Sequence, residues 1–351
     1  MRAAILRGAD IAVEQLDDPV PGPDQLLLAP IATGICGSDL HAVAARRALP
    51  DPSSAPPIVM GHEFCAEVVA AGSGTDGAPP PGTRVVAIPF AASEAGPRTI
   101  GLSPDRTGGL ATRVVMEAAS LLPVPDAVPS DHAALTEPLA VGLHAVNLAT
   151  RHREAPAVVI GCGPIGLAVI VALRAHGRGP IVAADLSAPR RAAAEALGAD
   201  LVLDPTAASP FDALEGFGFT ETPISPLLDE PPGPGGHPAG LTVFECVGAR
   251  GLINDLMTRA PRHTHVVVVG VCPGVDQITP LLGITKELTL EFSFAYRPSE
   301  VAAALDLIAQ YPDRVAPLIT ARLPLDATAD AFAQLASEPR QIKILIEPQR
   351  S

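Results

Sequence analysis

One cysteine, one histidine and two glutamates stand in short polar segments that are far apart in the first 140 residues. The segments are Cys36 to His41, Gly61 to Glu63 and Thr136 to Pro138. A thiolate, an imidazole and a carboxylate are ligands of a catalytic zinc, which leaves a fourth position for water or substrate. Single cysteines and histidines are common in any chain, so on spacing alone an ordinary buried thiol is the more frequent explanation of a residue such as Cys36. The pattern indicates a metal site without deciding for it.

A second segment that could do chemistry is glycine-rich. It reads Gly161-Cys162-Gly163-Pro164-Ile165-Gly166 and matches G-x-G-x-x-G, in which glycines let the backbone approach a pyrophosphate at a helix N-terminus. Asp185 follows where an acidic residue binds the adenosine ribose and repels a 2′-phosphate, which favours NAD over NADP. Arg190 and Arg191 stand nearby, and an arginine can accommodate that phosphate. The glycines alone also fit a bare turn. The predicted dinucleotide-binding residues are Gly161, Gly163, Pro164, Ile165, Gly166, Asp185 and Arg190.

The elements that position this turn alternate between strand and helix. The apolar and polar pattern predicts strands at 157–160, 180–184 and 201–203, with helices at 165–176 and 190–197 between them. Ser187 is a suitable N-cap for the second helix, and Gly198 is a natural stop. Because the connections are short, the alternation predicts a parallel sheet with helices on both faces.

The flanking residues have a different texture. Residues 1–125 hold short β-branched segments punctuated by proline and glycine, which is typical of an antiparallel, strand-rich domain. A helix at 301–310 and a closing strand at 342–346 are predicted near the end. Residues 204–240 are rich in proline and glycine, and their second half is predicted to be a surface loop. A chain of 351 residues is too long for one core. The predicted domains are residues 1–150 with 291–351, and residues 151–290.

Charge and composition exclude several classes of partner. The net charge is −14 and aromatic residues are 3% of the chain, so nucleic acids and anionic membrane surfaces are poor partners. The uncharged run at 155–173 is interrupted by Gly161, Gly163 and Gly166, which suits a strand, a turn and a buried helix better than a membrane span. Five scattered cysteines without a C-x-x-C pair make no disulfide framework, so the cytoplasm is the expected compartment.

Together these motifs resemble those of zinc-dependent medium-chain alcohol dehydrogenases. The shared segments, in the same order, are Gly34 to His41, Gly61 to Phe64, Gly82 to Val85, Glu137 to Val141 and Gly161 to Gly166. The Glu137-Pro138-Leu139 segment and Ser293 to Tyr296 are similar to the polyol, sorbitol and butanediol dehydrogenase branch. The resemblance covers nearly the whole chain. It implies an α/β protein in which a GroES-like, strand-rich catalytic domain is interrupted by a doubly wound Rossmann domain.

The resemblance also implies roles for single residues. Cys36 and His62 match zinc ligands, and Glu63 matches a carboxylate that binds zinc or alternates with water. Glu137 matches a direct ligand or one that reaches the metal through water, and which glutamate binds directly stays open. Ser38 matches the hydroxyl that hydrogen-bonds the substrate oxygen, and His41 a member of the proton relay. His41 is otherwise explained as a surface imidazole on a short helix.

The implied activity is hydride transfer between a secondary alcohol, diol or polyol and NAD, forming a ketone reversibly. Residues 91–109 contain no cysteine, so the structural zinc of many family members cannot form and one zinc per chain is expected. A homodimer or homotetramer is also implied. The alternatives are a zinc-independent NADPH reductase acting on enones or quinones, and a dinucleotide-binding protein without turnover.

Overall fold

The computed structural model describes residues 1–91, 98–219 and 240–350. The chain divides into two compact units, one of Met1–Glu137 with Val301–Ser351 and one of Pro138–Glu300. The boundary falls in the first turn of α3 (Thr136–Leu148). This helix goes with the second unit because a Cβ on Gly142 would stand 2.6 Å from the backbone of Ala168 in α4 (Pro164–Ala175). Most of the surface loop predicted in the second half of 204–240 lies outside the described residues.

The main sheet of the first unit has seven strands. Six are neighbours in the order β10 (Leu121–Pro123), β6 (Arg84–Ala87), β5 (Glu63–Ala71), β3 (Gln25–Gly34), β18 (Lys343–Glu347) and β17 (Ile319–Pro324), and β9 (Val114–Glu117) also pairs with β3. All pairs are antiparallel except β17 with β18. This agrees with the predicted strand-rich domain, and it places a strand from the end of the chain beside β3.

Among its described residues, this unit also contains two smaller sheets and three helices that lie wholly within it. The sheets are β2 (Asp10–Gln15), β1 (Arg2–Arg7) and β4 (Ile58–Val59), and β7 (Phe90–Ala91) with β8 (Arg98–Thr99). The helices lying wholly within it are α1 (Gly37–Arg47), α2 (Ser130–Ala133) and α9 (Thr328–Ser337). Leu6 and Ile344 from the sheets form one buried cluster with Val43 of α1 and Phe332 of α9. This cluster fixes α1, which begins directly after Cys36.

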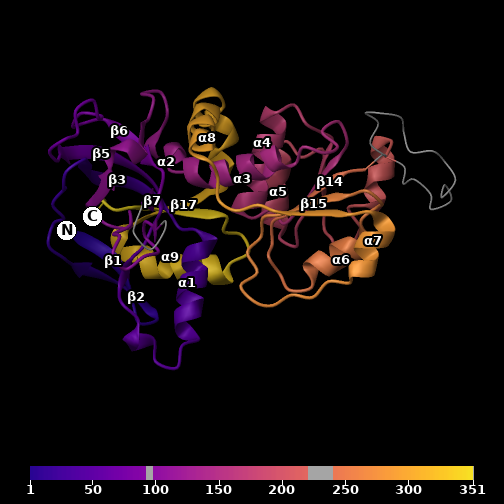
Figure 1. Cartoon of the computed structure of the whole chain (residues 1–351), viewed down its shortest axis with the longest axis horizontal. Coiled ribbons are helices and arrows are strands. Elements are labelled where there is room, and N and C mark those ends of the chain that lie inside the picture. Colours follow the sequence, from indigo (N-terminus) through magenta and orange to yellow (C-terminus); the bar gives the residue numbers. More distant parts are fainter. Residues whose placement is uncertain (92–97, 220–239, 351) are drawn as a thin grey trace. The chain divides into compact units, whose positions relative to one another are not determined.

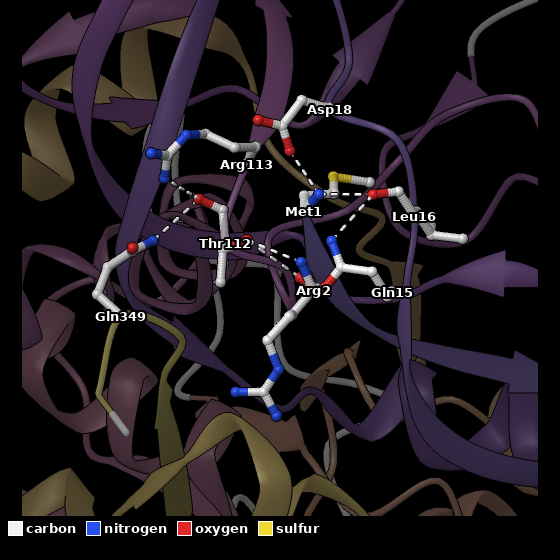
Figure 2. Close-up of polar contacts among 8 residues, drawn as sticks. All are labelled: Met1, Arg2, Gln15, Leu16, Asp18, Thr112, Arg113 and Gln349. Carbon is white, nitrogen blue, oxygen red and sulfur yellow. Dashed lines mark hydrogen bonds and ion pairs between the residues drawn. The ribbon is translucent and has the colours of Figure 1, made fainter.

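Thr112 joins three distant segments of the first unit (Figure 2). Its hydroxyl accepts a 3.0 Å hydrogen bond from the backbone N–H of Arg2. Its carbonyl accepts hydrogen bonds from Arg113 at 2.7 Å and from Gln349 at 3.0 Å. The backbone nitrogen of Met1 donates to the carbonyl of Leu16 at 2.6 Å. The first and last described strands are therefore tied to the same loop.

The second unit is built on a six-stranded sheet in which every pair is parallel. The order is β13 (Leu201–Leu203), β12 (Ile181–Ala184), β11 (Ala157–Ile160), β14 (Thr242–Glu245), β15 (His265–Val268) and β16 (Thr289–Phe292). The central strands are buried on both faces, which explains their continuous apolar sequences. The strand order reverses direction at β11, the position where dinucleotides bind in such sheets.

Helices cover both faces of this sheet, as the alternation predicts. Figure 1 shows α4 and α5 (Ala188–Ala196) on one side, and α6 (Leu252–Arg259) and α7 (Pro280–Lys286) on the other. Right-handed crossovers produce this arrangement when the strands proceed outward from β11 in both directions. The remaining helix, α8 (Pro298–Gln310), leads back into the first unit. In the part of the chain that is described, no helix combines the length and the apolar character needed to span a membrane.

Candidate functional site

Cys36 stands at the N-cap of α1, where the helix start holds it in place. Its backbone N–H donates to Oδ2 of Asp39 at 2.9 Å, and its side chain accepts from the backbone of the N3 residue, which completes a capping box. Asp39 is completely buried. The thiol is only half-buried, so it is accessible to an ion or substrate.

His62 and Glu63 enter the same region from the turn that begins β5. Gly61 precedes them with φ +96°, and a Cβ there would stand 2.7 Å from the backbone nitrogen of Leu110. Glu63 pairs with Gly34 across β3 and β5. A Cβ on Gly34 would lie 2.2 Å from Oε2 of Glu63, so a glycine is required for this carboxylate to fit. The side chains of His62 and Glu63 are both buried.

The Cys36, His62 and Glu63 side chains converge. One donor atom from each lies within 4.8 Å of the other two. Sulfur, nitrogen and oxygen donors around one tetrahedral zinc, with bonds of about 2.0–2.3 Å, are roughly 3–4 Å apart. This donor set therefore fits a zinc ion with small side-chain movements, and three ligands leave a fourth position open.

His62 is oriented by two neighbours from α1. Its Nδ1 lies 3.5 Å from Oδ1 of Asp39, and its Nε2 lies 3.3 Å from Oγ of Ser38. Burial lowers the pKa of His62, but the charges of Asp39 and Cys36 raise it, and the net pKa is well above the ordinary value of 6.5. With Nδ1 facing a carboxylate, Nε2 is the nitrogen suited to a metal.

Glu63 has a partner that the sequence analysis missed. Lys343, the first residue of β18, donates to Oε1 and Oε2 of Glu63 at 2.8 and 2.6 Å and to the carbonyl of Ile35 at 3.0 Å. Burial lowers the pKa of Lys343, but Glu63, Cys36 and Glu137 raise it, and the net pKa is above its ordinary value. A lysine inside the apolar run Ile342 to Ile346 is the signal that could have indicated it.

The other predicted site residues of the first unit lie around this centre. Ser38 is in the first turn of α1, and His41 stands exposed one turn further along the same helix. Glu137 is half-buried at the start of α3 and is not one of the three converging side chains. Its charge reaches Lys343, so it faces the same region from another element.

The glycine turn has the shape that its sequence predicts. Gly161 has φ +91°, and a Cβ on Gly166 would stand 1.8 Å from the carbonyl oxygen of Gly161. Gly163 is the N-cap of α4 and Pro164 occupies its first turn. Side chains are therefore excluded where the turn is tightest, and Ile165 and Gly166 present backbone N–H groups at the helix start.

Asp185 follows β12 and folds back over this turn. Its carboxylate accepts hydrogen bonds from the backbone N–H groups of Cys162 and Ser187, each at 2.7 Å. Burial and the charge of Asp185 raise the pKa of the Cys162 thiol to about 12, so this thiol stays protonated. A guanidinium nitrogen of Arg190 would lie 4.0 Å from a Cβ on Gly163. The sequence-predicted residues of the second unit thus lie together.

Comparison with known proteins identifies two sequence families in the chain. Residues 22–126 match the alcohol dehydrogenase GroES-like domain, and residues 164–310 match the zinc-binding dehydrogenase family. The (R,R)-butanediol dehydrogenase of Bacillus subtilis (strain 168) is 30% identical, with 97% of both chains covered. Human sorbitol dehydrogenase is also 30% identical over 92% of this chain and 89% of its own.

Solved structures show the same similarity. The 2R,3R-butanediol dehydrogenase of Bacillus subtilis superposes with a TM-score of 0.82 at 29% identity, covering 99% of each chain. A protein of Sinorhizobium meliloti 1021, described as a zinc-binding dehydrogenase and bound to NADP, gives 0.81 at 29% identity with 99% of both chains covered. Galactitol-1-phosphate dehydrogenase of Escherichia coli gives 0.82 at 25% identity, covering 99% of this chain and all of its own (100%).

Proposed function

Since the chain belongs to the zinc-dependent medium-chain alcohol dehydrogenase family, in its polyol and butanediol branch, we propose that it oxidises a secondary alcohol, diol or polyol to a ketone with NAD. Its relatives carry the names butanediol, sorbitol and galactitol-1-phosphate dehydrogenase, which supports a substrate with neighbouring hydroxyl groups. The observation that carries the proposal is the convergence of Cys36, His62 and Glu63 within 4.8 Å.

Each predicted site residue of the first unit has a proposed role. Cys36, His62 and Glu63 hold one catalytic zinc, and Glu137 reaches it directly or through water. Bound zinc acts as a Lewis acid that lowers the pKa of a substrate hydroxyl. Ser38 accepts the hydroxyl proton, and His41 passes it to solvent, which its exposed position one helical turn away supports. Because residues 91–109 lack cysteine, we expect one zinc per chain.

The second unit is proposed to hold the nicotinamide dinucleotide. The backbone of Gly161, Gly163, Pro164, Ile165 and Gly166 is proposed to bind the pyrophosphate at the start of α4. We assign NAD rather than NADP because Asp185 carries its negative charge at the end of β12, where a 2′-phosphate would lie. Arg190, beside Gly163, is proposed to contact the cofactor phosphates.

Assembly and compartment complete the proposal. Edge strand β16 and helix α7 carry exposed apolar side chains, and Phe294 just after β16 is 84% exposed. An apolar strand at the edge of the described sheet supports a homodimer or homotetramer. The net charge of −14 weighs against a nucleic acid or an anionic membrane as partner, and the proposed partner is a small alcohol or ketone. All five cysteines are free thiols, which supports the cytoplasm.

The proposal is tested by measuring metal content together with turnover. Purified enzyme should contain one zinc per chain and reduce NAD with secondary alcohols, diols or polyols. Cys36→Ser should lose both zinc and turnover while NADH binding, followed by fluorescence, is retained. Cys272→Ser, which removes a thiol from the second unit, is the matched control and should keep zinc and activity. Full activity of a zinc-free Cys36→Ser enzyme would refute the proposal.

A further inference from the structure

A cavity of about 360 Å³ lies in the second unit, away from the glycine turn. It is lined by the last turn of α3, the loop before β11 and the end of α4, and it is open to solvent on one side. The polar side chains that line it are Asn147, Arg153, Glu154, His176 and Arg178. A cavity of this size accommodates a small metabolite.

The topology separates this cavity from the dinucleotide turn. Arg153 and Glu154 precede β11 and His176 follows α4, so the cavity lies at the amino ends of the parallel strands. Gly161 to Gly166 lie at the carboxyl end of β11. One four-residue strand spans about 13 Å, and the 12-residue α4 about 18 Å. The cavity is therefore not an extension of the proposed cofactor site.

Arg178 is a buried cation with unused donors. It is 7% exposed, and its Nη1 donates to the carbonyl oxygens of Ala149 at 3.1 Å and Val146 at 3.4 Å, near the end of α3. Its Nε and Nη2 are buried without a hydrogen-bond partner. A buried donor left without a partner costs about 1–3 kcal/mol, more when it is charged. Arg178 also lines the cavity, so a small turn of its guanidinium would bring these donors to an acceptor there.

Two further basic side chains face the same space. Arg153 and His176 are exposed at its mouth. Burial and the charge of Arg153 lower the pKa of Arg178, while burial, Arg178 and Arg153 lower the pKa of His176. Glu154 is the one acidic side chain lining the cavity, and within the described residues neither Arg153 nor Arg178 forms an ion pair with a carboxylate. The repulsion among these basic side chains is therefore larger than the attraction that Glu154 supplies.

We propose that this cavity is an anion-binding site that takes the phosphate or carboxylate group of a small metabolite. The guanidinium of Arg178 binds the oxyanion from within, and Arg153 and His176 approach it from the mouth. Because Arg178 also holds the last carbonyls of α3, a bound anion stabilises the junction of α3 with α4. The site is independent of zinc and of turnover.

The test follows the imidazole of His176 by NMR. In protein labelled at the histidine Cε1 positions, with His176 identified by a His176→Gln variant, inorganic phosphate is titrated at constant ionic strength. A saturable shift of this resonance is expected, with affinity about tenfold lower in Arg153→Gln. Arg151→Gln, which removes a cation of the same loop that does not line the cavity, should bind phosphate as the wild type does.

Further arms separate the sources of the anion. A stronger response to phosphate than to acetate assigns a phosphorylated ligand, and the reverse assigns a carboxylate. Arg178→Lys keeps the positive charge but loses the paired donors of the guanidinium. It should therefore weaken the binding of both phosphate and acetate. If the His176 resonance moves no more with phosphate or acetate than with sodium chloride, or if Arg153→Gln leaves the titration unchanged, the proposal is wrong. Arg153→Gln changes an exposed side chain, so this decision does not depend on how Arg178→Lys folds.

Discussion

Glu63 and Lys343 form an ion pair of which almost nothing is exposed to water. Their side chains are 0% and 1% exposed, and the ammonium reaches both carboxylate oxygens. Removing one member of a buried pair leaves the other charge without compensation, which costs more than the pair itself contributes. This pair also determines the charge around the proposed zinc, because the Glu63 carboxylate that Lys343 binds is one of the three metal donors.

The first prediction concerns Lys343. Lys343→Met should lower the free energy of unfolding of the metal-free protein by about 3–5 kcal/mol, because Glu63 stays buried without a counter-charge. Urea unfolding measures this. The double variant Lys343→Met/Glu63→Gln should recover most of the loss, since no charge is left unpaired. A double variant as unstable as the single one would contradict the ion-pair explanation.

The second prediction concerns cofactor choice. Asp185→Asn should shift the ratio of kcat/KM for NADP over NAD by about tenfold towards NADP, because the charge that repels a 2′-phosphate is gone. The amide oxygen can still accept one of the two backbone hydrogen bonds that order the turn. Asp212→Asn removes an exposed charge elsewhere in the second unit and serves as control. An unchanged ratio in Asp185→Asn would exclude this carboxylate as the selector.

At the scale of elements, α3 and α8 are joined by one carboxylate. Glu300 in the first turn of α8 accepts hydrogen bonds from Asn147 of α3 at 2.9 Å and from the backbone N–H of Arg297 at 2.7 Å. It also lies 2.9 Å from Nδ1 of His144. Burial raises the pKa of Glu300, whereas Asn147, Arg297 and His144 lower it, and the net pKa is below the ordinary value of 4.5.

The third prediction is a pH dependence at this contact. Because the folded pKa is lowered, Glu300 contributes stability above about pH 4.5, and this contribution is lost as the pH falls through the folded pKa. At neutral pH, Glu300→Gln should destabilise the protein by about 1 kcal/mol, a value that allows for solvent screening. Urea unfolding of both proteins from pH 7 to pH 4 should show the difference shrinking. A difference that grows with acidity would contradict the assignment.

The sequence predicts the parallel sheet well because its signals are local. The apolar strands between 157 and 203, the N-cap Ser187 and the stop Gly198 each act within a few residues. Lys343 and Asp39 could not be assigned in this way. The partners of Lys343 are 280 and 308 residues away, and Asp39 meets His62 only once β5 is placed beside α1.

The candidate site residues also divide into those that local sequence signals position and those that only tertiary contacts position. Cys36, His62 and Glu63 converge because three local devices, a helix cap and two glycine positions, aim their side chains. Glu137 is held by a separate helix, and no short-range pattern fixes its distance from the other three. Residue type and motif therefore predicted the three residues that converge, whereas tertiary contacts determine their spacing and the place of Glu137.

At the scale of the whole molecule, the proposed zinc donors belong to one unit alone. Cys36, His62 and Glu63 all lie in the unit of Met1–Glu137 and Val301–Ser351. A ligand that binds the native state stabilises the region that contains its site. The two units should therefore respond differently to removal of the metal.

The fourth prediction uses hydrogen exchange to show this difference. A zinc chelator should accelerate amide exchange in α1 and at the start of β5, because three buried or half-buried donors lose their common ion. Amides of β11 and β14, in the parallel sheet, should exchange as before. Re-addition of zinc is the control and should restore protection. Equal acceleration in both sheets would show that the ion does not act locally.

β18 lies between β3 and β17 in the main sheet, although it comes after all the other described strands in the sequence. During synthesis on the ribosome, residues 138–300 can therefore fold as soon as they emerge, while the earlier unit waits for its final strand. Until that strand arrives, the carboxylate of Glu63 lacks its ammonium partner. A nascent chain arrested before residue 343 should thus hold the unit with the parallel sheet already folded, while the main sheet of the other unit still lacks β18.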